Sequence, residues 1–295
     1  MFEGVLPALI TPFKDDKIDF SALETLIDRH LAAGVSGFVL LGTTAETAAL
    51  TDAEKEEIIK FSSQKINGKA KIIIGAGTNN TNATLRNIET AAKYGPDAVL
   101  VVTPYYNKPN LSGMIAHYTA AAKAGLPIVL YHIPGRTGQK LSVKFFEELL
   151  AAVPAIKAVK ESDYDIAHIT QMAVKFGGGR LNYICGNDDL WPAFLGMGSR
   201  CVISAGSNTF SPAFVKIYNL FCEGKTQEAI LVFRAVYDIV DASFYEVNPT
   251  CCKYMLEKLG LCSSGVRLPL GPLAPETKQK IDAVLKAVDK NLLIK

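Results

Sequence analysis

Short apolar runs rich in valine and isoleucine recur along the chain at intervals of about thirty residues, and polar segments separate them. Eight such runs occur: Val5–Ile10, Phe38–Leu41, Ile72–Ile74, Ala98–Val102, Ile128–Tyr131, Ile156–Lys160, Tyr183–Cys185 and Val202–Ser204. A strand whose two faces are both covered is apolar throughout its length. The runs therefore predict parallel strands buried by helices.

The segments between the runs carry helical periodicity and helix boundary signals. Leu23, Leu26, Ile27 and His30 recur at the spacing of one helix face. Thr51 stands three residues before Glu54, the pattern of a capping box at a helix start. Three glycines stand where helices are expected to end: Gly34, Gly95 and Gly125. The order is strand, helix, strand, helix.

Eight strand–helix units fit a closed (β/α)8 barrel, or TIM barrel, better than an open sheet of fewer strands. After about residue 223 the strand signal stops, and helical patterns follow around Ala229–Val240, Cys252–Leu259 and Thr277–Ala287. The sequence predicts an α/β barrel domain over residues 1–223 and a small all-helical C-terminal domain over residues 224–295.

Composition narrows the class of protein. Of the 295 residues, 49% are hydrophobic and 20% are charged, which is ordinary for a globular enzyme and excludes disorder. The net charge of +2 gives no field that would hold a nucleic acid. The longest stretch without Asp, Glu, Lys or Arg, residues 30–45, is shorter than the ~20 residues of a membrane-spanning helix. The start of the chain shows no secretion signal, so we expect a soluble, cytoplasmic protein.

Cofactor and metal motifs are weak. Gly75-Ala76-Gly77 follows a predicted strand, but Asn80 stands where a dinucleotide fingerprint needs its third glycine. The four histidines, His30, His117, His132 and His168, lack the H-E-x-x-H spacing and are not expected to pair with acids. The six cysteines form no C-x-x-C pair and are interpreted as reduced thiols. We predict no cofactor and no metal.

Lys160 is the most informative residue at a strand end, where barrel enzymes carry their chemistry. Alternation places Ile156, Ala158 and Lys160 on one face, so an inward Ile156 would bring Lys160 inward too. Desolvation favours the neutral amine, which condenses with a ketone to an imine and so acidifies the adjacent carbon. The alternative is a lysine that reaches solvent, or one that pairs with Glu46 or Glu161.

Other polar residues end neighbouring runs. The hydroxyls of Tyr131, Tyr106 and Thr43 could shuttle protons during imine formation, although packing alone also explains buried tyrosines. The Gly42-Thr43-Thr44 turn could bind a carboxylate through backbone N–H groups, or could simply start a helix. Arg136 could hold a second carboxylate as a bidentate fork, or could form a surface ion pair.

Four motifs in this order and spacing resemble the dihydrodipicolinate synthase branch of the pyruvate-dependent class I aldolases. They are Gly42-Thr43-Thr44-Ala45-Glu46, Val102-Thr103-Pro104-Tyr105-Tyr106-Asn107, Tyr131-His132-Ile133-Pro134-Gly135-Arg136-Thr137-Gly138 and Val159-Lys160-Glu161. The likeness extends from Gly4 to Arg267-Leu268-Pro269. It implies a barrel enzyme that condenses pyruvate with L-aspartate 4-semialdehyde in lysine and diaminopimelate biosynthesis, usually as a homotetramer built as a dimer of dimers.

The resemblance also implies roles for individual residues. Lys160 would form the imine with pyruvate and Tyr131 would be the general acid and base. Thr43 would link Tyr131 to Tyr106, which would reach in from a neighbouring subunit. The substrates would be held by Thr44 at the pyruvate carboxylate and Arg136 at the semialdehyde carboxylate, with Gly186 and Ile203 lining the pocket.

Three other functions are compatible with a barrel of this kind. N-acetylneuraminate lyases typically have Gly-Ser-Thr in place of Gly42-Thr43-Thr44 and lack an arginine at position 136, which favours the synthase. Aldolases of sugar acids such as 2-keto-3-deoxy acids share the imine chemistry and are the second candidate. A barrel that only binds ligands is the third.

Five positions depart from the pattern of the relatives. His132 replaces an Asn of many relatives, and Ala45 replaces a Gly, which implies that no positive φ is needed at position 45. Asp52, Lys55 and Ala83 stand where lysine-inhibited relatives carry two histidines and a glutamate. Because Lys55 would repel a cationic effector, we predict weak or absent feedback by L-lysine.

Overall fold

The computed structural model describes residues 1–179 and 181–294, and these residues form two compact units. The first unit contains Met1–Glu3 and Ile72–Val202. The second contains residues 4–71 and the chain from Ile203 onward. The predicted boundary between residues 223 and 224 separates α9 from α10, and the division into domains at that point stays a prediction.

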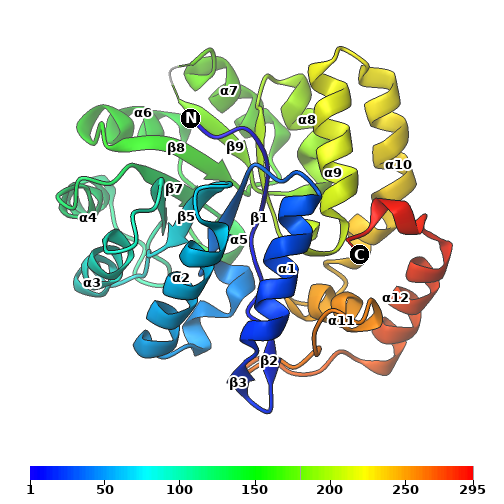
Figure 1. The fold of residues 1–295 in the computed structure, drawn as a ribbon. Coiled ribbons are helices and arrows are strands. Elements are labelled where there is room, and N and C mark those ends of the chain that lie inside the picture. The colour runs from blue at the N-terminus through cyan, green and yellow to red at the C-terminus, as the bar shows by residue number, and fades with distance from the viewer. Residues whose placement is uncertain (180, 295) are drawn as a thin grey trace. The chain divides into compact units, whose positions relative to one another are not determined.

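In the first unit strands alternate with helices, as the periodicity predicts, and Figure 1 shows α4 and α6 beside β7 and β8. The elements in chain order are β5 (Lys71–Gly75), α3 (Thr81–Ala92), β6 (Ala98–Val102), α4 (Leu111–Ala122), β7 (Ile128–His132), α5 (Pro134–Thr137), α6 (Val143–Ala152), β8 (Ile156–Glu161), α7 (Ile166–Phe176), β9 (Asn182–Cys185), the 3-10 turn η3 (Asp188–Leu190), α8 (Trp191–Gly196) and β10 (Cys201–Ser204).

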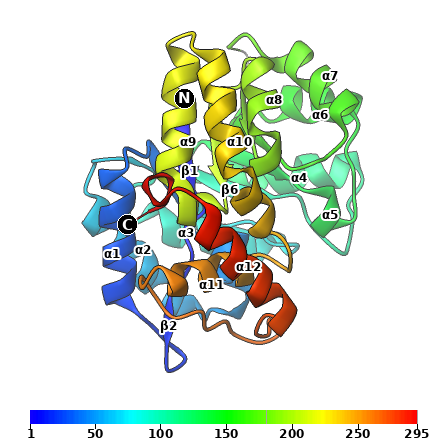
Figure 2. The ribbon, with the colours of Figure 1, turned by 90° about the vertical axis from the view of Figure 1, so that its right-hand side faces the viewer.

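The second unit begins with strands and helices and continues with helices alone in the part that the structure describes. Its first elements are β1 (Gly4–Pro7), β2 (Phe13–Lys14), β3 (Lys17–Ile18), α1 (Phe20–Ala32), β4 (Gly37–Leu40), the 3-10 turns η1 (Thr43–Ala45) and η2 (Thr47–Ala49), and α2 (Asp52–Ile66). The later ones are α9 (Ser207–Cys222), α10 (Thr226–Ala242), α11 (Thr250–Lys258), α12 (Pro275–Ala287) and η4 (Lys290–Leu292). Figure 2 shows α9 and α10 side by side.

All eight predicted strands are present, and those of the first unit stand side by side in the order β10-β9-β8-β7-β6-β5. In the first unit the pairs from β5 to β9 are parallel, and Val202 of β10 lies beside Cys185 of β9. In the second unit Ala8 N–H donates to Ser204 O at the end of β10, and Leu9 N–H donates to Val39 O of β4. Consecutive parallel strands with intervening helices are the hallmark of an α/β fold.

Helix boundaries follow the expected chemistry. Thr51 caps α2 by accepting from Glu54 N–H, and the Glu54 side chain bonds back to Thr51 N–H, so the predicted capping box is confirmed. Ser142 caps α6 by accepting from Phe145 N–H. The three predicted C-terminal glycines all have positive φ.

One element escaped the sequence pattern. Strands β2 and β3 pair antiparallel as a hairpin, and Asp15 and Asp16 between them have φ of 50° and 59°. Aspartate tolerates this left-handed region better than most residues, and two such residues make the tight turn that suits a hairpin. Two-residue strands are too short to show a period, which is why the pattern missed them. Among the described residues no helix is long and apolar enough to cross a membrane.

Candidate active site

Strands β7 and β8 place Tyr131 and Lys160 directly opposite each other. Both residues stand near the carboxyl ends of their strands and are partners in the parallel register. The Lys160 Nζ atom lies 4.2 Å from the centre of the Tyr131 ring. Because neighbouring residues in register on parallel strands project to the same face, the amine and the phenol share one environment.

Lys160 is buried, with 6% of its surface exposed, and so is Tyr131. The carboxylates that could have paired with the lysine are engaged elsewhere: Glu46 Oε1 accepts from Lys253 Nζ at 2.5 Å, and Glu161 pairs with His132. Within the described part of the chain, Lys160 makes no ion pair. The alternatives of a solvent-directed lysine and of a Glu-paired lysine are therefore wrong.

The sequence predicted the burial of Lys160 from the alternation of faces along residues 156–160, and that step was wrong. The β7–β8 register shifts between its first two pairs, so that Ile156 and Ala158 face Ile128 and Val129 and Lys157 has no partner. A bulge of this kind interrupts the alternation of faces. Ile156 therefore does not fix the side to which Lys160 points, and the Tyr131 pairing does.

Three other predicted residues of the first unit lie just after the ends of strands β6, β7 and β9. Tyr106 comes after β6, has φ of 69° and is 90% exposed, so its ring packs against nothing in its own unit. Arg136 is exposed in the one-turn helix α5. Gly186 follows β9 and donates its N–H to Glu161 O at 2.8 Å. A Cβ at this position would lie 2.6 Å from the same backbone oxygen, so only glycine allows this approach.

The remaining predicted residues belong to the second unit. Thr43 is exposed and Thr44 is buried, and the Thr44 hydroxyl oxygen accepts from Asn248 Nδ2 at 2.9 Å. Ile203 of β10 is fully buried. In the same turn the left-handed residue is Glu46, with φ of 55°, while Ala45 is not among the positive-φ residues. The inference drawn from Ala45 is confirmed.

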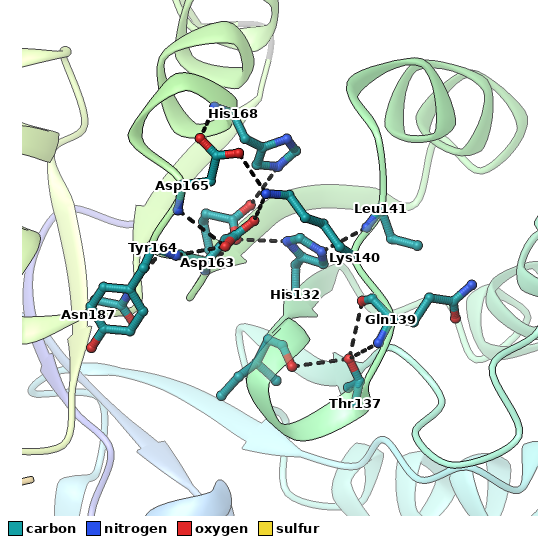
Figure 3. A network of polar contacts seen from close by, with 12 residues as sticks. His132, Thr137, Gln139, Lys140, Leu141, Asp163, Tyr164, Asp165, His168 and Asn187 are labelled. Atoms are coloured by element: carbon teal, nitrogen blue, oxygen red, sulfur yellow. Dashed lines mark hydrogen bonds and ion pairs between the residues drawn. The ribbon is translucent and has the colours of Figure 1, made fainter.

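The sequence did not predict a buried group of polar side chains on β7 and β8, on the faces of these strands that point away from Tyr131 and Lys160. His132 and His168 of this group are labelled in Figure 3. His132 Nδ1 lies 2.7 Å from Glu161 Oε1, and His168 Nε2 lies 3.5 Å from Glu161 Oε2. Burial alone would raise the pKa of Glu161, but hydrogen bonds from His132 and His168 outweigh it and hold that pKa below its ordinary value. The expectation that the histidines do not pair with acids is wrong, because the register brings residues 132 and 161 together.

These three side chains are of the types that hold zinc, and their ligand atoms lie within 4.8 Å of one another. However, Leu141 N–H donates to His132 Nε2, so in the neutral ring the proton is on Nδ1, the atom that faces Glu161. A metal at Nδ1 would require that proton to leave. The group is therefore better described as a hydrogen-bonded network than as a metal site.

A cavity of about 910 Å³ lies at the other end of the strands in the first unit. Residues at the starts of β8 and β9 line it, among them Ile156, Lys157 and Asn182, together with the Gly177–Gly179 turn. Lys160 and Tyr131 are not in its lining. This cavity is therefore separate from the candidate site.

A parallel strand–helix fold with a buried lysine near a strand end, beside a tyrosine, defines the class of barrel enzymes equipped for imine chemistry. Comparison with known proteins narrows the class. The model of the dihydrodipicolinate synthetase family matches residues 1–288. The chain belongs to this family.

Individual relatives agree. The 4-hydroxy-tetrahydrodipicolinate synthase of Methanospirillum hungatei JF-1 is 37% identical over 292 residues, which are 98% of this chain and 100% of that protein. A crystal structure of dihydrodipicolinate synthase from Thermotoga maritima is 34% identical, with a TM-score of 0.93 over 97% of this chain and 98% of the other. A monomeric dihydrodipicolinate synthase variant is 33% identical, with a TM-score of 0.93 over 97% and 96%.

The comparisons confirm three predictions made from the sequence: the family, the (β/α)8 barrel class with helices at its C-terminal end, and an enzyme of the lyase type. They favour the synthase over the sugar-acid aldolases, because the curated relatives carry the synthase name. The roles of individual site residues stay predictions.

Proposed function

We propose that this chain is a 4-hydroxy-tetrahydrodipicolinate synthase, which condenses pyruvate with L-aspartate 4-semialdehyde through an imine at Lys160. One observation carries the chemistry: a buried amine without a carboxylate partner in the described chain lies 4.2 Å from the ring of a buried tyrosine. The family supplies the substrates.

The steps follow from the groups present. Lys160 Nζ attacks the keto carbon of pyruvate, and the carbinolamine loses water to give a protonated imine. The cationic nitrogen withdraws electrons, so a proton leaves the pyruvate methyl group and an enamine forms. The enamine carbon then attacks the aldehyde of the second substrate, and the aldehyde oxygen takes up a proton to become a hydroxyl group. The amino group of that substrate attacks the imine carbon and displaces Lys160 Nζ, which closes the ring of the product and frees the amine. Tyr131 moves protons onto and off the departing oxygen, which it can do as a neutral acid and base in turn.

The other residues complete the proposal. Thr43 passes protons between Tyr131 and a Tyr106 supplied by a neighbouring subunit; the 90% exposure of Tyr106 supports a partner for that ring. Thr44 holds the pyruvate carboxylate, Arg136 holds the carboxylate of the semialdehyde, and Gly186 and Ile203 line the pocket. This scheme requires an assembly of at least two chains, for which we propose a homotetramer in the cytoplasm.

Borohydride trapping tests the proposal. Incubation with pyruvate and borohydride should attach one reduced pyruvate to Lys160, located by peptide mass mapping, and Lys160→Ala should gain none. Tyr131→Phe should still be trapped, but more slowly, because the amine is intact and the proton donor is lost. If the wild-type chain gained no adduct, the imine mechanism would be wrong.

A second assay separates the synthase from its alternatives. Supplying pyruvate with aspartate semialdehyde, and in parallel a sugar-acid substrate, gives turnover only with the correct partner. Turnover on the sugar acid alone would favour the second candidate. Adduct formation without turnover on either substrate would indicate a binding protein.

A further inference from the structure

The His132–Glu161–His168 group, which we call the strand-end network, is wholly enclosed. The side chains of His132 and Glu161 have no exposed surface, and His168 has 6%. Glu161 Oε1 accepts from His132 at 2.7 Å and from Asp163 N–H at 2.8 Å. Buried carboxylates are costly unless such donors satisfy them, so these contacts hold Glu161 in one place.

The direction of the hydrogen bonds is fixed by the backbone. Leu141 N–H can only donate, and it reaches His132 Nε2 at 3.1 Å. His132 Nε2 is therefore an acceptor, and Nδ1–H donates to Glu161. A second proton on the ring would oppose the Leu141 N–H. The network therefore runs one way, from Leu141 N–H through the His132 ring to the Glu161 carboxylate.

The network stands immediately next to the proposed reacting pair. His132 and Glu161 are register partners, and they follow the Tyr131–Lys160 pair by one residue on each strand. Because successive residues of a strand point to opposite faces, the network lies behind the two strands while Tyr131 and Lys160 share the other side. Ser162 N–H donates to His132 O at 2.9 Å and Gly186 N–H to Glu161 O at 2.8 Å, so the backbone is tied at the same level.

We propose that Glu161 is a positioning residue, which through His132 locks the ends of β7 and β8 so that the Lys160 amine stays over the Tyr131 ring. This inference rests on the proposed function of Lys160. Loss of the lock lets either strand end turn about its axis, which moves the amine relative to the phenol. Misplacement by about 1 Å is enough to slow a reaction by roughly 100-fold.

The test measures the rate of pyruvate imine formation by borohydride quenching at short times, scaled to the final number of trapped sites. Glu161→Leu removes every side-chain contact and should slow the rate by about 100-fold. Glu161→Gln keeps one acceptor oxygen and should slow it by about 10-fold, while His132→Asn keeps one donor and should stay within about threefold. The KM for aspartate semialdehyde should not change in any of them.

Lys140→Met is the matched control. Lys140 bridges Asp163 and Asp165 at 3.0 and 2.7 Å in the same group of contacts (Figure 3). Its side chain is 45% exposed, and its ion pairs are with these two aspartates. This variant should form the imine at the wild-type rate. A merely structural role for Glu161 would instead lower the number of trappable sites and leave the rate per site unchanged.

The outcomes are separable. A wild-type chain that traps no pyruvate overturns the proposed function and this inference together. A wild-type chain that is trapped normally, beside a Glu161→Gln variant with an unchanged rate per site, overturns the inference alone. If Glu161→Leu does not fold, Glu161→Gln and His132→Asn still decide. The inference is supported if imine formation is slower in Glu161→Gln and close to the wild-type rate in His132→Asn and Lys140→Met.

Discussion

Two buried carboxylates that lie next to proposed site residues, Glu46 in the second unit and Glu161 in the first, are stabilised by different partners. In the second unit Glu46, two residues after Thr44, accepts from the Lys253 ammonium at 2.5 Å and from Arg267 N–H at 2.8 Å. In the first unit Glu161, next to Lys160, accepts from the ring of His132 and from Asp163 N–H. Glu46 is paired with an ammonium group, and Glu161 with an imidazole ring and a backbone N–H.

We expect the partners of Glu46 to matter most for the stability of the fold, and the partners of Glu161 to matter most for the orientation of the neighbouring site residues. Removing the cation of a buried ion pair leaves an uncompensated charge, whereas removing a neutral donor leaves a carboxylate that is one hydrogen bond short. Burial lowers the pKa of Lys253 although Glu46 opposes the shift, so the pair only partly repays the cost of enclosing the ammonium. The Glu46 network is thus the more sensitive point for folding, and the Glu161 network is the more sensitive point for chemistry.

The largest effect is expected from Lys253→Met. This change leaves Glu46 buried without its cation and should lower the free energy of unfolding by about 3–5 kcal/mol, measured by urea denaturation. Combining it with Glu46→Gln removes the stranded charge and should recover part of the loss. A Lys253→Met protein as stable as the wild type would show that the two networks do not differ in this way.

Acid should act on the second unit through His30. This ring is fully buried against Ser211 Oγ at 3.0 Å, and burial lowers its pKa from 6.5 to about 3. Below about pH 6.5 His30 becomes protonated in the unfolded chain but stays neutral in the folded chain. The folded state therefore loses stability as the pH falls from 6.5 toward 3.

The His30 contribution should be about 1 kcal/mol per pH unit between about pH 6 and 4. Unfolding curves at several pH values should therefore fall less steeply for His30→Asn than for the wild type. Identical slopes for the two proteins would remove His30 as the cause. In the first unit, His132 and His168 face a carboxylate instead. His117 of the same unit resembles His30, because it lies 3.0 Å from Thr81 Oγ1 and burial lowers its pKa.

Arg267→Lys should have a smaller effect. The guanidinium binds Glu54 through two nitrogens at 2.7 and 2.9 Å and Asp16 through a third at 2.9 Å, while it stacks on Phe13. Lysine keeps the charge and loses the fork, and the site is partly open to solvent, so the cost should be about 1 kcal/mol. If Arg267→Lys lowered the free energy of unfolding as much as Lys253→Met does, the partly exposed Arg267 contacts would be as important for stability as the buried Glu46–Lys253 pair.

Feedback by L-lysine should be the smallest effect. Lys55 forms an ion pair with Asp52 at 3.0 Å on α2, and its ammonium would repel a cationic effector. Initial rates should change by less than about twofold at millimolar L-lysine. Inhibition at micromolar concentration would contradict this prediction, and Lys55→Ala would then show whether the ammonium takes part.

The sequence by itself determined the features that depend on short windows: the eight strands, the Thr51 capping box and the glycines that end helices. It also placed Lys160 and Tyr131 near strand ends, because each apolar run stops there. Only the tertiary structure decided which residues stand opposite each other. The bulge at Lys157 shifted the face on which the pattern relied, and the register joined His132 to Glu161 across 29 residues.

The Glu46–Lys253 pair, 207 residues apart along the chain, was beyond any local pattern for the same reason. Periodicity records how each segment divides into buried and exposed faces, and it contains nothing about which buried face meets which. Those pairings arise when the strands and helices pack together, and the charge of each buried group is settled by the partners it meets there.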